Sequence, residues 1–180
     1  TGRAQPHTSP IDGQSIVGPT MLNLSQAESA IEQARKQHLD WSKTSLDERK
    51  SRVQRAVELL REHRDVIAQL ILWEIGKPWR LACADVDRAI EGVEWYLGEI
   101  DRQMAGRTPL PGPVSNIASW NYPLSVLVHA ELVQLLAGNA VIAKTPTQGG
   151  FLSLTLSHAL MARVGLPVTL LSGSGAAFLH

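Results

Sequence analysis

The stretch SWNYP at residues 119–123 decides the fold, because it separates a segment of strand character, 114–119, from one of helical character, 123–137. A second short apolar strand, 140–144, follows this helix and ends at Lys144. When two parallel strands are joined by a helix, the right-handed crossover brings both carboxyl ends to one edge of the sheet. The sequence therefore predicts that an amide, Asn121, and an ammonium, Lys144, lie at the same sheet edge.

The same pattern continues with a helix over 151–163 and a strand over 168–171. Short apolar strands that alternate with helices indicate a parallel sheet with both faces covered. We therefore expect an α/β fold, a Rossmann-like parallel βαβαβ sheet preceded by an N-terminal helical segment. The proline-rich stretch 109–113 marks the change in character, and it divides the chain into a helical part, residues 1–107, and a βαβαβ core, residues 108–180.

The helical part is expected to contain four helices. Two S-x-x-E sequences, at residues 25–28 and 45–48, have the spacing of a capping box and predict where the first two helices begin. A third helix is predicted over 65–75 and is expected to stop at the glycine that follows it. The fourth is predicted over 79–104, and a short strand near 15–17 precedes all four.

Composition excludes several classes of partner. The chain has 17 Lys and Arg against 17 Asp and Glu, so it lacks the positive charge that nucleic acid attracts. A single cysteine, Cys83, excludes an internal disulfide and suits a reducing compartment. No segment has the pattern of a signal peptide or the apolar length of a membrane span. We therefore expect a cytoplasmic protein with no nucleic-acid and no membrane partner.

Candidate site residues follow the three strands, because ligands of open parallel sheets bind beyond the carboxyl ends of the strands. Asn121 either caps the helix that begins at Pro123 or donates an amide N–H to a developing oxyanion. Lys144 either extends its ammonium to the surface or binds the hydroxyls or phosphate of a cofactor. Gly173 would let the backbone approach a diphosphate, although the third glycine of the dinucleotide fingerprint is absent.

A series of motifs, in this order, resembles the NAD(P)-dependent aldehyde dehydrogenase superfamily. Each motif is weak alone, but together they span nearly the whole chain at near-family spacing. They are Trp41 with DER at 47–49, EIGKP at 74–78, GPV at 112–114, IASWNYPL at 117–124, LAGNAV at 136–141, KTP at 144–146 and GLP at 165–167.

The resemblance implies that a small-molecule aldehyde is oxidised to a carboxylic acid with NAD(P) through a cysteine thiohemiacetal, while Asn121 helps to hold the oxyanion. Residues 1–107 then form the helical part of the cofactor domain, and residues 108–180 form its cofactor-binding core. The resemblance also places a set of residues at cofactor-binding positions: Ile117, Ala118, Trp120, Lys144, Thr147 and Gly173.

The residue at position 147 bears on the choice of cofactor. The family often has a glutamate there, which accepts a hydrogen bond from the 2′-hydroxyl of the adenosine ribose. Thr147 is neutral and would not repel a 2′-phosphate. The resemblance therefore implies that NADP is tolerated or preferred over NAD.

The chain also departs from the family pattern. The nucleophilic cysteine and the general-base glutamate of the family lie downstream of Gly175, so a chain that ends at His180 is expected to be truncated and inactive alone. Cys83 lies among small apolar residues on a predicted helix and is expected to be a packed residue. Residues 107–113 are short where the family inserts a hairpin that begins an intersubunit arm, so a homo-oligomer would have a shortened arm.

Three other interpretations stay open. An acylating, CoA-dependent aldehyde dehydrogenase or reductase would share these motifs, because the residues that separate it lie elsewhere. A non-catalytic remnant that binds a dinucleotide would lack a reactive cysteine after His180. A mainly helical interaction domain would bind no dinucleotide at millimolar concentration. No metal site is expected, because the histidine and glutamate at 129–131 lack the H-E-x-x-H spacing.

Overall fold

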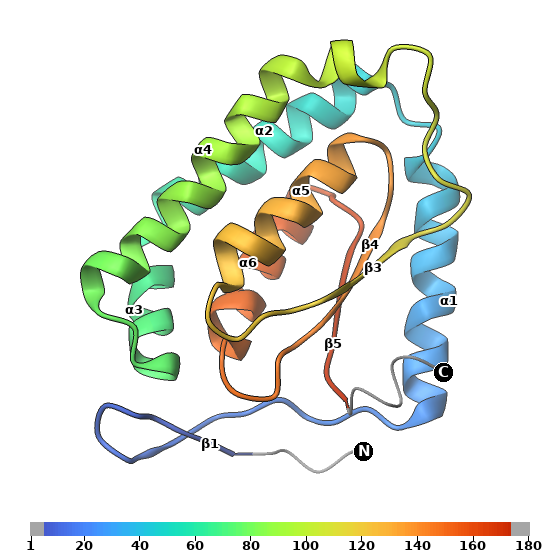
Figure 1. The fold of residues 1–180 in the computed structure, drawn as a ribbon. Helices are drawn as coiled ribbons and strands as arrows, with labels where there is room; N and C mark the ends of the chain where they lie inside the picture. Colours follow the sequence, from blue (N-terminus) through green and yellow to red (C-terminus); the bar gives the residue numbers. More distant parts are fainter. Residues whose placement is uncertain (1–5, 174–180) are drawn as a thin grey trace.

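The computed structural model describes residues 6–173 and contains a three-stranded parallel sheet with the order β3-β4-β5 (Figure 1). The register pairs Ile117 with Lys144, and Lys144 with Leu171. All three strands therefore end at the same level, and the predicted α/β class with a parallel βαβαβ sheet is confirmed. The strands are β3 (Val114–Ile117), β4 (Val141–Lys144) and β5 (Val168–Leu171).

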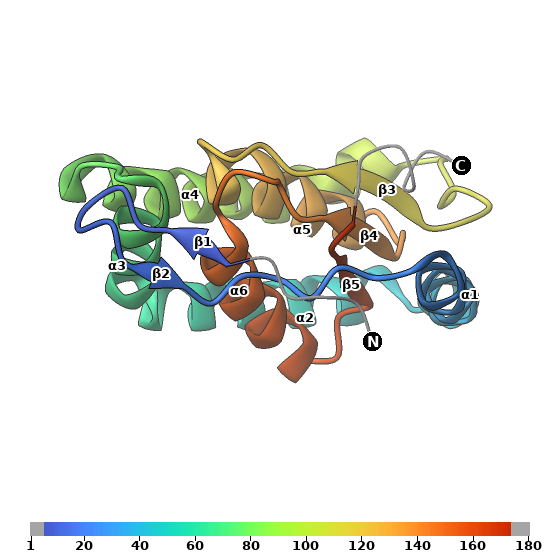
Figure 2. The same ribbon diagram turned by 90° about the horizontal axis from the view of Figure 1, so that it is seen from below.

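Helices cover this sheet in layers. Helices α5 and α6 pack directly on β4 and β5, and α2, α3 and α4 form a further layer behind them, while α1 contacts β4 and β5 separately (Figures 1 and 2). A short antiparallel hairpin, β1 (His7–Thr8) with β2 (Ser15–Ile16), precedes the helices. The helices are α1 (Leu24–Trp41), α2 (Leu46–Glu62), α3 (Arg64–Ile75), α4 (Trp79–Met104), η1 (Pro123–Val128), α5 (His129–Leu136) and α6 (Phe151–Arg163).

Strand β4 is buried on both faces, as its unbroken apolar sequence predicts. Successive side chains of a strand point to opposite faces. Val141 and Ala143 accordingly join the main core with the layered helices, whereas Ile142 packs with Ala34 of α1 and with Leu171. The sheet thus separates a large hydrophobic cluster from a small one.

The first helix begins earlier than the sequence predicts. Asn23, not Ser25, is the N-cap: its Oδ1 accepts from Gln26 N at 2.9 Å, and Gln26 Oε1 accepts from Asn23 N at 3.1 Å. Asparagine and glutamine therefore make the capping box that was expected from serine and glutamate. The predicted start of the second helix is confirmed, because Ser45 Oγ accepts from Glu48 N and caps α2.

The helix predicted over 123–137 begins in a different form. Its first six residues make a π-helix, η1, and α5 continues from there to Leu136. Tyr122 occupies the N-cap position of η1, and its side chain makes no capping hydrogen bond. The interpretation of Asn121 as a helix cap is therefore wrong. A carboxylate from another helix replaces it: Asp85 Oδ1 accepts from Ser125 N at 2.9 Å. The strand before it also ends at Ile117, two residues earlier than predicted.

Cys83 is only 6% exposed and belongs to the main core, which confirms that it is a packed residue.

None of the helices formed by residues 6–173 combines the length and the apolar character needed to cross a bilayer.

Candidate functional site

The carboxyl ends of the three strands form one continuous edge. Beyond β3 and β4 the ladder is extended by Ala118 N, which donates to Lys144 O at 3.0 Å, and by Thr145 N, which donates to Leu171 O at 2.8 Å. The loops that follow β3 and β4 are neighbours, because a methyl group built on Gly150 would lie 3.7 Å from Trp120 O. The backbone therefore brings the loop of Asn121 and the loop after Lys144 to the same place.

Asn121 lies in the loop between β3 and η1. Its Oδ1 accepts a hydrogen bond from the hydroxyl of Ser119, and its main-chain carbonyl accepts from Lys77 Nζ at 2.8 Å. Within residues 6–173 no acceptor is bound to the amide nitrogen of Asn121. The side chain is therefore oriented by its oxygen, and the two N–H groups are left to donate elsewhere.

Lys144 is buried, with only 4% of the residue exposed, so of its two interpretations the one in which the ammonium reaches the surface is wrong. Nζ donates to Thr145 O at 2.7 Å, and no carboxylate in the part of the chain that the structure describes pairs with it. Burial lowers the pKa of Lys144 from its ordinary value. A buried ammonium with one protein acceptor has two N–H groups for further acceptors.

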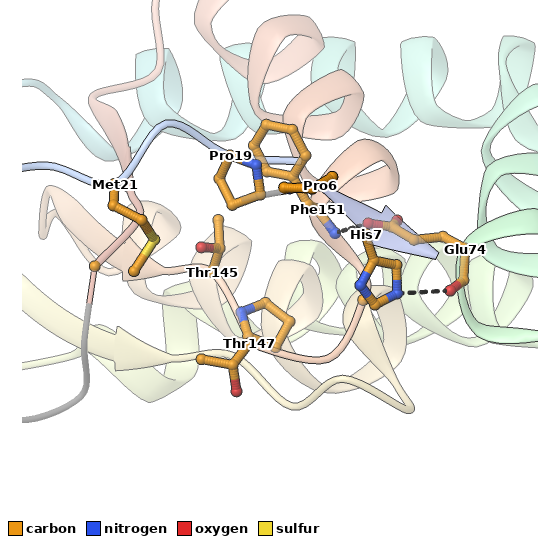
Figure 3. A pocket seen from close by; sticks show the side chains of 11 residues that line it. Pro6, His7, Pro19, Met21, Glu74, Thr145, Thr147 and Phe151 are labelled. Carbon is orange, nitrogen blue, oxygen red and sulfur yellow. Dashed lines mark hydrogen bonds between the residues drawn. The ribbon is translucent and has the colours of Figure 1, made fainter. Parts of the chain in front are cut away.

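The remaining candidate residues lie along this edge. Ile117 ends β3 and is 59% exposed, whereas Ala118 is buried directly after it. Trp120 is 48% exposed, and Thr147 is also exposed. Gly173 and Thr147 line one cavity (Figure 3), with a volume of about 40 Å³, enough for a few waters and too small for a nucleotide. The other residues that line it are Pro6, His7, Pro19, Met21, Glu74, Thr145, Pro146, Gly149 and Phe151.

Glu74, in the wall of this cavity, is a residue whose role the sequence did not reveal. Its carboxylate accepts from Phe151 N at 2.6 Å and from Leu152 N at 3.0 Å, so it caps the N-terminus of α6 (Figure 3). Burial raises the pKa of Glu74, and these two backbone hydrogen bonds oppose that rise. The only sequence signal was its place in the motif EIGKP, since no pattern links residue 74 with a helix 77 positions later.

Lys77 and Asp85 were missed for the same reason. Lys77 Nζ lies 3.3 Å from Asp85 Oδ2, and both side chains are nearly excluded from solvent. Neither has a local sequence partner that points to the loop of Asn121. In addition, no three His, Cys, Asp or Glu side chains within residues 6–173 gather in a way that could hold a metal ion.

The arrangement defines a class of protein: a Rossmann-like α/β domain whose polar groups lie at the carboxyl edge of a parallel sheet. The chain belongs to the aldehyde dehydrogenase family, whose model matches residues 1–178.

Curated relatives extend well beyond the length of this chain. The bifunctional protein PutA of Salmonella typhimurium is 31% identical over 179 residues, which cover 97% of this chain and 14% of that protein. Aldehyde dehydrogenase [NAD(P)+] 2 of Saccharomyces cerevisiae is 30% identical over a match that covers 92% of this chain and 36% of the yeast protein. The chain thus spans well under half of each of these relatives.

Solved structures show the same fold. The NADP-dependent glyceraldehyde-3-phosphate dehydrogenase of Bacillus halodurans C-125, complexed with NADP, superposes with a TM-score of 0.87 at 25% identity, over 97% of this chain and 41% of that one. A 1-pyrroline-5-carboxylate dehydrogenase from Thermus with bound NAD also gives 0.87 at 25% identity, over 98% of this chain and 37% of its own.

Proposed function

We propose that this chain is the NAD(P)-binding part of an aldehyde dehydrogenase that oxidises a small-molecule aldehyde to a carboxylic acid. Residues 108–180 are its cofactor-binding core and residues 1–107 its helical part. The observation that carries the proposal is the sheet edge, where an oriented amide, Asn121, and a buried ammonium, Lys144, follow aligned strands. Family membership supports the reaction class.

The residues present fit a dinucleotide. Lys144 has donor capacity beyond its bond to Thr145 O, and it would bind the ribose hydroxyls of the cofactor. Trp120, which is 48% exposed, would offer its ring to the ligand, and the backbone at Ile117, Ala118 and Gly173 would flank it. The nicotinamide, when bound, supplies the hydride acceptor.

Asn121 is proposed to act on the aldehyde itself. When a thiolate outside these residues attacks the carbonyl carbon, the carbonyl oxygen gains negative charge. The amide nitrogen of Asn121 would donate to this oxygen, because Ser119 already binds the amide oxygen. One donor of this kind contributes about 2.7–4 kcal/mol to transition-state stabilisation.

Substitution of Lys144 tests the cofactor site directly on the 180-residue chain. Lys144→Met should weaken the binding of NADP by about 10–100-fold, because a charge-assisted hydrogen bond contributes about 1.5–3 kcal/mol. Isothermal titration calorimetry measures this dissociation constant. Lys50→Met is the matched control, since Lys50 pairs with Asp101 on the surface. This variant should bind NADP as tightly as the parent chain does. No binding of NADP or NAD by the parent chain at millimolar concentration would refute the proposed cofactor site.

The choice of cofactor is tested at Thr147. We propose that NADP binds at least as tightly as NAD, since this exposed threonine carries no charge. Thr147→Glu should weaken NADP binding about tenfold and leave NAD binding unchanged or stronger, because a carboxylate repels the 2′-phosphate and accepts from a 2′-hydroxyl. Dissociation constants for both cofactors, measured on parent and variant, check this. A parent chain that strongly prefers NAD contradicts it.

A further inference from the structure

We propose that Lys77 and Asp85 are positioning residues that hold Asn121 at the place where its amide can meet a developing oxyanion. The inference rests on the proposed function of Asn121, and it adds two residues to the site: Lys77, just before α4, and Asp85, within α4. Neither residue is proposed to touch the substrate or the cofactor.

Lys77 fixes the loop before η1 through its ammonium. Nζ donates to Asn121 O at 2.8 Å, lies 3.3 Å from Asp85 Oδ2, and stands 3.8 Å from the ring centroid of Tyr122. The lysine side chain is 11% exposed, so water competes weakly for these contacts. One ammonium thereby holds the backbone of residue 121 and the side chain of residue 122 at once.

Asp85 fixes the other end of the same segment. Its side chain is fully buried, and its second oxygen, Oδ1, accepts from Ser125 N at 2.9 Å. Since η1 has no side-chain cap of its own, this carboxylate satisfies a donor in its first turn. One ion pair therefore holds both ends of the segment from Asn121 to Ser125, through Lys77 before α4 and Asp85 within it.

Lys77 and Asp85 bind main-chain groups of the segment from Asn121 to Ser125. The ammonium of Lys77 and the carboxylate of Asp85 neutralise each other, and both are occupied by main-chain groups. Ser119 binds the amide oxygen of Asn121, and within the described residues no acceptor is bound to its amide nitrogen. An oxyanion donor is effective over a narrow range of about 2.7–3.1 Å, and a shift of about 1 Å can cost roughly a hundredfold in rate.

The test is a double-mutant cycle in the full-length dehydrogenase that carries this chain, assayed by steady-state aldehyde oxidation. Asn121→Ala should lower kcat by about 10²–10³-fold. Lys77→Met should lower kcat by about tenfold while the KM for the cofactor stays within about twofold of the parent. The double variant should be no slower than Asn121→Ala alone, because Lys77 acts only through that amide. Lys50→Met is the matched surface control and should keep parent kinetics.

The outcomes separate the two proposals. If Asn121→Ala leaves kcat unchanged, the proposed role of Asn121 fails, whatever Lys77 does. If Asn121→Ala is slow but the two losses multiply in the double variant, the positioning role of Lys77 is overturned. A rise in the cofactor KM of Lys77→Met, with kcat unchanged, also overturns it.

A second measurement covers a variant that is too unstable to assay. In the isotopically labelled 180-residue chain, the side-chain amide resonances of Asn121 report its environment directly by NMR. Asp85→Asn keeps an oxygen for Ser125 N but removes the charge that holds Lys77, so these resonances should shift and broaden. Unchanged Asn121 resonances in both Asp85→Asn and Lys77→Met would overturn the proposal, since the amide would then be held without the pair.

Discussion

His158→Leu should lower the free energy of unfolding by about 3–5 kcal/mol, because it leaves the carboxylate of Glu131 buried without its partner. His158 Nε2 lies 3.1 Å from Glu131 Oε1, and the exposed fractions of the two side chains are 6% and 0%. The other oxygen, Glu131 Oε2, is buried with no hydrogen-bond partner among the described residues. Among residues 6–173, His158 is the only basic side chain that forms an ion pair with this carboxylate.

Geometry indicates that this histidine is charged. Its Nδ1 lies 2.8 Å from Leu154 O and its Nε2 faces Glu131 Oε1, so both ring nitrogens meet acceptors. Two acceptors require two donors, which the imidazolium provides. Burial by itself would lower the pKa of His158, but the charge and hydrogen bond of Glu131 outweigh burial and raise the pKa.

Urea unfolding followed by tryptophan fluorescence measures the effect at pH 7. The control is the double variant His158→Leu with Glu131→Met, which removes both charges and keeps the volume. Replacing both members of a buried pair is often neutral or stabilising, so the double variant should be as stable as the parent or more so. A single variant as stable as the double variant would show that the carboxylate needs no partner.

The pH dependence follows from the direction of the shift. Because the folded-state pKa of His158 is raised above its unfolded value, the stability that it contributes is fully present below about pH 6.5. This stability is lost as the pH rises through the raised folded-state pKa. The parent should therefore lose stability relative to the double variant as the pH rises above about 6.5, and a constant difference would contradict a charged His158.

Gly149→Ala should destabilise the protein by about 2–4 kcal/mol. Gly149 has φ +102°, where an L side chain is strained by about 1–2 kcal/mol, and a built Cβ would lie 2.4 Å from Ile75 Cγ2. Ile75 packs against the main core and is β-branched, so it has little freedom to move away. Overpacking of this kind adds about 1–3 kcal/mol.

The matched control is Gly13→Ala. Gly13 has φ +71°, but no atom lies within 4 Å of a Cβ built on it. It should cost only the backbone strain, about 1–2 kcal/mol, so the difference between the two variants measures the contact with Ile75. Equal losses in urea unfolding would contradict the steric argument. Since Gly149 follows Thr147 in the same loop, Gly149→Ala should also weaken NADP binding, whereas Gly13→Ala should not.

The sequence predicted the elements well where the signals are local. The helices 79–104 and 151–163 and the strand 168–171 have the bounds that hydrophobic periodicity and flanking glycine or proline indicate. Gly76 ends α3 in the left-handed conformation, with φ +68°. The shared edge of the strand ends follows from the parallel direction of strands that helices connect, which needs no side-chain information.

The parts that the sequence did not predict depend on contacts between distant segments. Asp85 caps a helix 40 residues away, and Glu74 caps another 77 residues away. A capping rule written for neighbouring residues cannot find such partners. The acceptor in the first turn of η1 likewise comes from Asp85 of α4 and not from Asn121. The sequence also left two interpretations of Lys144 open, since snorkelling is the ordinary behaviour of a lysine at a strand end.

The carboxylate of Glu74 at the start of α6 has an electrostatic consequence for ligand orientation. A helix N-terminus ordinarily attracts a phosphate, because its free N–H groups and its dipole favour negative charge. In this protein, two of those N–H groups already bind an internal anion. A diphosphate that approached α6 would meet repulsion and occupied donors. In the proposed cofactor complex, the diphosphate would therefore lie away from this helix, and the neutral ribose hydroxyls would face the β4 end of the sheet.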